Sequence, residues 1–269
     1  MSALQKYELN NYYAIAEQLT SENIVLLAKG EIMAIQVKNF YPKDIAEKAT
    51  KRVNHNGVNY YLNAPDIGRV GMAFYETDLD PNLVNQYYAI AMQNLSVARK
   101  MFSPYLSPID KLRLDLQEIW MPGANIENLH NKKMFVGLFR KIEAGVSMLP
   151  HRDDVRVDSG YSLKSLEIEG QIAANIYLQM PHHNGGDLEL WDLTLSENEF
   201  NELREPGSYG ITRDKLPAPT CIVRPEVGDL VLFNARRIHA VSQSQDDERL
   251  SVSCFVGYRG CKQPLTYWS

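Results

Sequence analysis

The sequence predicts an α+β protein with a mainly β core, a double-stranded β-helix (jelly roll) supported by N-terminal helices. Two observations predict this class. Apolar residues recur at helical spacing in the first half of the chain, whereas from about residue 133 short apolar runs alternate with turn residues. The 269 residues show no internal repeat and no clean linker. We therefore expect one domain over 1–269, with a helix-rich support region (1–130) and a jelly-roll core (131–269).

Composition excludes several classes of protein. Hydrophobic residues make up 45% and charged residues 23% of the chain, which is typical of a globular protein and not of a disordered one. A net charge of -5 without a basic stripe argues against a nucleic-acid partner. No signal peptide or membrane-spanning run is present in the sequence. Three widely spaced cysteines suit reduced thiols, so we expect a cytoplasmic protein. We also expect a monomer or homodimer.

The first half of the chain predicts mostly helices. Residues 1–30 are expected to be helical or irregular, and loops with short strands are expected over 55–80. The elements with clear signals are a strand over 32–39, a helix over 43–54 that follows Pro42, a helix over 81–102 with apolar residues at helical spacing, and a helix over 108–120 that ends before Pro122.

The second half predicts strands. The candidate strands are Met134–Ile142, Gln171–Gln179, Asp187–Trp191, Thr220–Val223, Asp229–Phe233, Ile238–Ser242 and Leu250–Tyr258. Asn184-Gly185-Gly186 is a strong turn signal between two of them. The polar stretch 193–219 is long for a loop inside a β domain, and such inserts are often functional, so we expect a lid there.

His151 and Asp153 are the first candidate metal ligands. They lie two positions apart after an extended run, and residues two apart on a strand project on the same face. His239 follows an apolar strand signal and supplies a second imidazole. Two imidazoles and one carboxylate with open positions form the facial triad of non-haem Fe(II) oxygenases. The alternative for the His-x-Asp pair is a solvated strand end, and for His239 a hydrogen-bonded core histidine.

Arg249 is the candidate anchor for an organic acid. If the strands before and after 243–246 form a hairpin, His239 lies opposite Arg249, and Ser251 lies opposite Arg237. The guanidinium fork beside the metal ligand then suits bidentate capture of a carboxylate, and Ser251 adds a hydroxyl. The alternative for Arg249 is an ion pair with a neighbouring acidic residue.

These residues together predict a cosubstrate. Three protein ligands leave three octahedral positions, two for a 2-oxo acid whose distal carboxylate is held by Arg249 and one for dioxygen. Asn175 and Tyr177 share a face of a strand that would line the barrel, and Arg140 precedes the His-x-Asp stretch. We expect Asn175 and Tyr177 to contact the 2-oxo acid, and Arg140 to contact the 2-oxo acid or the substrate. Structural polar groups and a surface charge are the alternatives.

The motifs resemble those of the Fe(II)/2-oxoglutarate-dependent oxygenases over about 134–269. The C-terminal half is most similar to the group that contains the freestanding, carrier-independent halogenases of indole alkaloids. The stretches that carry this resemblance are Gly185–Leu190, Pro225–Asn234 and Tyr267–Ser269, together with the position of Arg140. The resemblance implies Fe(II), 2-oxoglutarate and O2 as cofactors, with release of succinate and CO2.

One residue departs from the halogenase pattern. The resemblance implies a small residue where this chain has Asp153, because that gap admits chloride to the iron. The carboxylate instead implies hydroxylation of an unactivated C–H bond in a free small molecule, such as an amino acid derivative, an alkaloid or a nucleoside-like compound. Three alternatives stay open at this point: a cupin-like metal enzyme without 2-oxoglutarate, a non-catalytic sensor on the same barrel, and an oxygenase that acts on a macromolecule.

Overall fold

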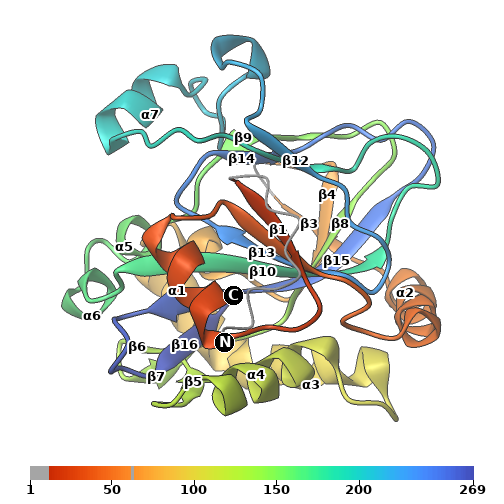
Figure 1. Cartoon of the computed structure of the whole chain (residues 1–269), viewed down its shortest axis with the longest axis horizontal. Coiled ribbons are helices and arrows are strands. Elements are labelled where there is room, and N and C mark those ends of the chain that lie inside the picture. The colour runs from red at the N-terminus through yellow and green to blue at the C-terminus, as the bar shows by residue number, and fades with distance from the viewer. Residues whose placement is uncertain (1–11, 62–63) are drawn as a thin grey trace, which may run out of the picture.

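Two β-sheets that pack face to face form the centre of the molecule (Figure 1). The computed structural model describes residues 12–61 and 64–269. The major sheet has ten strands, of which eight follow the order β1 (Tyr13–Ala16), β2 (Ala34–Val37), β13 (Leu230–Asn234), β10 (Gly170–Gln179), β15 (Arg249–Tyr258), β8 (Leu138–Ile142), β4 (Ile67–Val70) and β3 (Asn59–Tyr60). The other two are β16 (Leu265–Trp268), which pairs with β15, and β5 (Ala124–Ile126), which pairs with β16.

The minor sheet is smaller and contains His151 and His239. Its four strands follow the order β12 (Cys221–Val223), β11 (Leu188–Leu190), β14 (His239–Val241) and β9 (Met148–His151). A separate hairpin joins β6 (Asn128–Leu129) to β7 (Lys132–Lys133). The double-sheet core with its helices confirms the predicted α+β class and jelly roll.

Helices cover the outer face of the major sheet (Figure 1). They are α1 (Ser21–Lys29), α2 (Lys43–Asn56), α3 (Pro81–Phe102) and α4 (Pro108–Ile119), with the 3-10 turn η1 (Phe74–Thr77) before α3. The short helices α5 (Val155–Asp158) and α6 (Leu163–Leu166) follow β9, and α7 (Glu197–Leu203) with the turn η2 (Arg213–Lys215) lies between β11 and β12. Helix α3 begins where Asp80 caps the Asn82 amide and Pro81 takes the first helical position, which is why its predicted bounds are confirmed.

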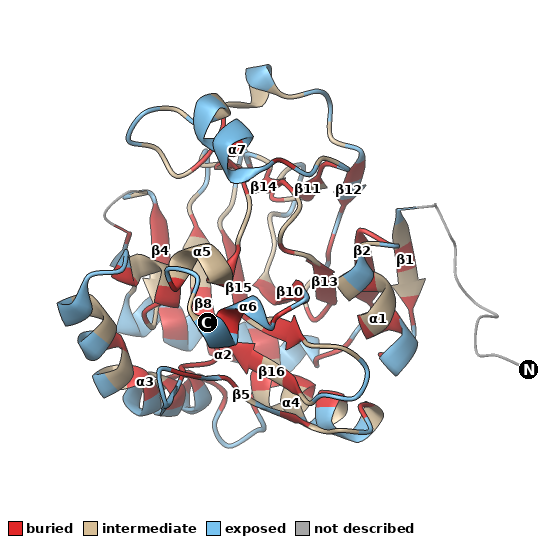
Figure 2. Cartoon of the chain, turned by 90° about the vertical axis from the view of Figure 1, so that its left-hand side faces the viewer, coloured by how far each residue is buried: buried red, intermediate tan, exposed pale blue. Residues whose placement is uncertain are grey.

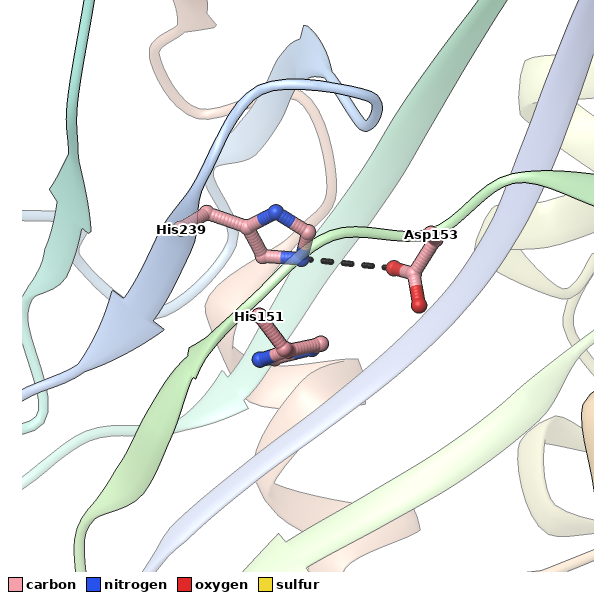
Figure 3. Close-up of side chains that lie close together, drawn as sticks. All are labelled: His151, Asp153 and His239. Atoms are coloured by element: carbon pink, nitrogen blue, oxygen red, sulfur yellow. Dashed lines mark ion pairs between the residues drawn. The ribbon is translucent and has the colours of Figure 1, made fainter. Parts of the chain in front are cut away.

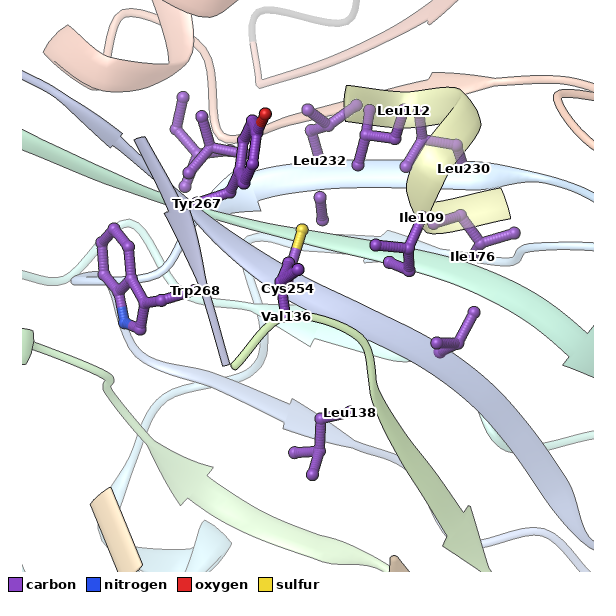
Figure 4. Packing of buried hydrophobic residues seen from close by; sticks show 14 of the residues in the cluster. Ile109, Leu112, Val136, Leu138, Ile176, Leu230, Leu232, Cys254, Tyr267 and Trp268 are labelled. Carbon is purple, nitrogen blue, oxygen red and sulfur yellow. The ribbon is translucent and has the colours of Figure 1, made fainter. Parts of the chain in front are cut away.

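Alternation along β10 and β15 separates two environments. Even-numbered residues of these strands, such as Ile176 and Cys254, enter the core beneath the helices (Figure 4). Odd-numbered residues, such as Asn175 and Ser253, face the minor sheet, since successive side chains of a strand point to opposite faces. The interior between the two sheets therefore receives polar groups from a sheet whose other face is apolar.

The contribution of the helix-side core can be measured on α4. Leu112 of this helix is fully buried and is seen in the cluster of Figure 4, whereas Leu114 on the same helix is 47% exposed. We expect Leu112→Ala to lower the free energy of unfolding by about 2–5 kcal/mol, because it removes buried methyl groups and leaves a cavity. Leu114→Ala should change it by no more than about 0.5 kcal/mol. Urea titration of both variants checks this, and equal effects would contradict the assigned packing.

Several elements differ from the sequence prediction. The strand expected over Met134–Ile142 begins only at Leu138, where pairing with β15 begins. The sequences of β1 and β16 show no clear alternation of apolar and polar residues, and these strands were not predicted. β1 pairs with β2, and β16 pairs with β15. Residues 1–11 of the N-terminal segment lie outside the described residues. The helix-rich region also contributes β1 to β5 to the major sheet.

The insert 193–219 is more ordered than a polar loop. Helix α7 and the segment that follows bury a small core of their own against β14, which includes Phe200, Ile211 and Ile238. Gly210 lies so close to β9 that an added Cβ would be 2.7 Å from the Pro150 carbonyl oxygen, so only glycine fits there. The insert therefore packs closely against β9, the strand that ends in His151. Among the described residues, no helix has the length and apolarity needed to cross a membrane.

Candidate metal centre

His151, Asp153 and His239 converge at one end of the minor sheet (Figure 3). His151 is the last residue of β9, and His239 is the first of β14 and pairs with it directly. Asp153 lies two residues beyond β9 and not on the strand as predicted; its amide donates to the Ala235 carbonyl at 2.9 Å. This hydrogen bond holds Asp153 near the two histidines. One potential ligand atom of each of the three residues lies within 4.8 Å of the others.

Backbone carbonyls orient both imidazoles. His151 Nδ1 lies 2.7 Å from the Leu149 carbonyl oxygen, and His239 Nδ1 lies 3.0 Å from the Arg237 carbonyl oxygen. An Nδ1–H that donates to a carbonyl leaves Nε2 of a neutral ring as the metal-binding atom. Burial, together with the charge of His239, lowers the pKa of His151 to about 4, so this ring is neutral at pH 7.

The carboxylate stays ionised despite its position. Burial acts to raise the pKa of Asp153, but the contact with His239 and the charge of His151 outweigh it and lower the pKa to about 2. His239 Nε2 lies 3.3 Å from Asp153 Oδ2 (Figure 3). A neutral His151 and an ionised Asp153 are therefore available as ligands at neutral pH.

This donor set fits a divalent metal. Both ring nitrogens of His239 face an acceptor oxygen, the Arg237 carbonyl on one side and Asp153 on the other. A neutral imidazole has only one N–H. A cation held by Nε2 and the carboxylate satisfies both sides, and His151 offers a third ligand to the same point. Imidazole with carboxylate is the ligand chemistry of non-haem Fe(II) sites.

A small inner cavity of about 30 Å³ adjoins the triad between the two sheets. Arg249 lines it and is only 3% exposed. Its Nε has no hydrogen-bond partner, and within the described ranges no carboxylate forms an ion pair with this guanidinium. The neighbouring acidic residues, Asp246 and Glu248, instead contact His183 and Lys141. A buried cation without an anion is costly, so this cavity is suited to an anionic ligand.

The predicted hairpin is wrong, although Arg249 does reach the site. His239 lies on β14 in the minor sheet, whereas Arg249 lies on β15 in the major sheet, where it pairs with Ile142. Residues 242–248 therefore cross from one sheet to the other. Arg249 faces the triad across the interior, and Arg237 does not lie opposite Ser251: it donates to the Gly30 carbonyl at the outside of the barrel.

The other predicted cofactor contacts differ in their access to the inner cavity. Asn175 and Arg140 line it directly. Tyr177 lies under the guanidinium of Arg249, with Arg249 Cζ 5.0 Å from the ring centroid, and its buried hydroxyl has no partner. Ser251 is buried and pairs with both Arg140 and Tyr177 in register, but it is not among the residues that line the cavity.

Sequence reasoning missed three residues at the site. Ser253 follows Arg249 by four positions on the same face of β15 and lines the inner cavity, a position that the alternation of this strand would have indicated. Tyr75 accepts a hydrogen bond from Arg140 at 3.2 Å. Tyr209 of the insert packs against His151 with ring centroids 5.6 Å apart, and its hydroxyl accepts from the Leu149 amide. No local pattern marks Tyr75 or Tyr209.

A larger outer cavity of about 330 Å³ meets the inner one at the triad. His151, Asp153 and Arg140 line both cavities. The outer walls come from α5, α7, Tyr61 and Ala64. Arg249 lines the inner cavity but not the outer one, so the site offers separate places for a cosubstrate and a substrate.

The chain is similar to known proteins over nearly its whole length. A family model described as carrier-protein-independent halogenase WelO5 matches residues 14–269. The L-isoleucine 3(1)-dioxygenase of Pantoea ananatis is 25% identical over 270 residues, which is 92% of this chain and 88% of that protein. The L-gamma-glutamyl-L-propargylglycine hydroxylase of Streptantibioticus cattleyicolor is 30% identical over 177 residues, which is 64% of this chain and 63% of that protein.

A solved structure has the same fold. The N-substituted L-amino acid dioxygenase from Burkholderia ambifaria, in complex with alpha-KG, superposes with a TM-score of 0.65 at 16% identity. The match covers 98% of this chain and 96% of that one. At this identity the likeness supports the jelly-roll assignment alone.

Proposed function

Because the chain belongs to the WelO5 family of Fe(II)/2-oxoglutarate-dependent oxygenases, whose family model matches residues 14–269, we propose a role for each residue of its site. The protein is an Fe(II)- and 2-oxoglutarate-dependent dioxygenase that hydroxylates an unactivated C–H bond of a free small molecule. The observation that carries this proposal is the His151, Asp153 and His239 cluster next to a buried, unpaired Arg249.

His151, Asp153 and His239 hold the metal in this proposal. Their carbonyl contacts fix the ring orientation before metal binding, and the ionised carboxylate supplies the negative charge that a divalent cation requires. When bound there, Fe(II) supplies the dioxygen chemistry that converts 2-oxoglutarate to succinate and CO2 while a substrate C–H becomes C–OH. His151 and His239 are nearly inaccessible to solvent, so the surrounding chain limits access of water.

Arg249 holds the distal carboxylate of 2-oxoglutarate. The guanidinium offers two parallel N–H donors, and Tyr177 beneath it offers the free hydroxyl. Asn175 lines the same cavity and is placed to contact the cosubstrate. Arg140 sits where the two cavities meet and contributes positive charge to either ligand. Ser251 supports this group from the adjacent strand position, without direct access to the cavity.

Asp153 favours hydroxylation over halogenation. Its carboxylate lies at the metal site, so no open position of the kind that admits chloride remains beside the two histidines. The relatives named above as a dioxygenase and a hydroxylase agree with this outcome. An outer cavity of about 330 Å³ suits a small molecule, and amino acids are the substrate class that we propose.

Arg249 also argues against the alternatives. A cupin-like enzyme without 2-oxoglutarate does not need a buried, unpaired guanidinium beside the metal. A non-catalytic sensor is typically marked by loss of a ligand, and all three ligands are present here. A net charge of -5 remains unsuited to nucleic acid.

We also propose a domain organisation and a location for the protein. We propose a single domain over 1–269 because strands from both halves of the chain form the major sheet. The insert 193–219 acts as a lid in this proposal, since its Tyr209 touches His151. The three free thiols suit a reducing compartment, so we propose a cytoplasmic location. For the oligomeric state we propose a monomer or homodimer.

Anaerobic binding of Fe(II) and 2-oxoglutarate tests the proposal. We expect addition of both to the protein to produce a metal-to-ligand charge-transfer band, because the 2-oxo acid chelates a metal held by the triad. Acetate in place of 2-oxoglutarate should give no band, since it lacks the 2-oxo group. With oxygen and a panel of L-amino acids, succinate release should then exceed that of the substrate-free reaction. Absence of the band would refute the cosubstrate assignment.

A further inference from the structure

Asp158 is a carboxylate that faces the outer cavity and has no assigned role. It is the last residue of α5, the short helix that begins two residues after Asp153 and lies below α7 in Figure 2. Asp158 thus places a carboxyl group on the wall of the proposed substrate cavity.

This carboxylate lacks a partner. Among residues 12–61 and 64–269, no hydrogen bond or ion pair reaches it, and only burial and two other carboxylates act on it. The remaining acidic residues of the same wall are all engaged. They are Asp153 in the metal site, Asp154, which pairs with Arg156, and Glu197, which accepts a hydrogen bond from Tyr161.

The surroundings of Asp158 disfavour an isolated negative charge. Burial raises its pKa well above the usual range, and the charges of Asp153 and Asp154 add to that effect. A half-buried carboxylate without compensation is unfavourable, and within the described residues no cation pairs with it. A positively charged group of the ligand would remove this cost and gain a charge-assisted hydrogen bond.

We propose that Asp158 binds the ammonium group of a free α-amino acid and thereby selects free amines over N-acylated ones. The inference rests on the proposed function and adds its specificity. Arg140 and Arg204 line the same cavity, and the Arg204 side chain has no ion pair among the described residues, so the substrate carboxylate also meets positive charge. An amide nitrogen is uncharged and gains nothing comparable from Asp158.

Binding to the anaerobic holoprotein tests this selection. The Fe(II)- and 2-oxoglutarate-loaded protein is titrated by calorimetry with each standard L-amino acid and with its N-acetyl derivative. We expect at least one free amino acid to bind about 10-fold or more tightly than its acetylated form, the value of one charged hydrogen bond. Asp158→Asn should weaken binding of that amino acid by a similar factor and leave the acetylated form unchanged, which removes the discrimination.

Asp214→Asn is the matched control. Asp214 is exposed on the insert and is not among the residues that line either cavity, so this variant should keep the wild-type preference. The charge-transfer band must form in Asp158→Asn, which verifies that the variant is folded and loaded. Equal binding of the two forms, binding by no free amino acid, or an unchanged preference in Asp158→Asn would overturn the inference. Failure of the wild-type band would instead refute the proposed function on which it rests.

Discussion

Asp153→Ala is expected to abolish 2-oxoglutarate-dependent hydroxylation and to weaken Fe(II) binding by at least about 100-fold, since loss of an outer-sphere partner alone costs roughly 10–100-fold. The variant removes the only carboxylate of the triad and leaves the imidazoles of His151 and His239. Calorimetric titration with Fe(II) under anaerobic conditions measures the affinity, and succinate release measures the activity.

Two companion variants define what this result means. Asp154→Asn changes the next residue, whose carboxylate caps α5 and pairs with Arg156 outside the triad, so Fe(II) affinity should stay within a few-fold of wild type. Asp153→Gly in the presence of chloride tests whether the carboxylate is the main barrier to halogenation. Full activity of Asp153→Ala would contradict its role as a metal ligand.

Arg249→Gln should weaken 2-oxoglutarate binding by roughly 30-fold or more, because truncating one member of a buried charge pair costs about 2–5 kcal/mol. Arg249 is 3% exposed and lies against Tyr177, so solvent cannot replace its charge. The intensity of the charge-transfer band as a function of 2-oxoglutarate concentration gives the dissociation constant. Fe(II) affinity in the absence of 2-oxoglutarate should be nearly unchanged, since Arg249 is not a metal ligand.

Two further variants distinguish how charge, donor geometry and long-range electrostatics affect 2-oxoglutarate binding. They are Arg249→Lys and Arg224→Gln. Lysine keeps the charge but not the fork, so we expect an intermediate loss. Arg224 is 76% exposed at the surface, and its replacement should leave the dissociation constant unchanged. An equal loss in Arg224→Gln would indicate a long-range charge effect and contradict direct binding by Arg249.

Local signals explain which predictions were confirmed. The bounds of α3 follow from Asp80, Pro81 and an apolar stripe, all of which act within a few residues. The candidate metal ligands, which the structure brings together, were found for a similar reason: a His-x-Asp pair and a histidine after a buried strand are recognisable from their spacing. Alternation likewise placed Asn175 and Tyr177 on one face of β10, and both lie at the site.

Strand partners could not be read in the same way. Alternation states which side chains of one strand share a face, but it does not state which strand lies alongside. Residues 242–248 have the polar composition of a hairpin turn, yet they connect β14 of the minor sheet to β15 of the major sheet. Arg249 therefore reaches the triad across the interior and not as a cross-strand neighbour of His239.

The fold class and the candidate metal ligands followed from residue types and short spacings in the chain. Arg249 was named from a strand pairing that the structure does not contain, and its place beside the triad depends on the tertiary fold. Tyr209 touches His151, and Asp158 stands unpaired in the outer cavity, because elements distant in sequence pack there. Whether a charge is compensated depends on all of its neighbours in space. The proposed role of Asp158 could therefore be inferred only from the packed structure, whereas the candidate metal site could be inferred from the sequence.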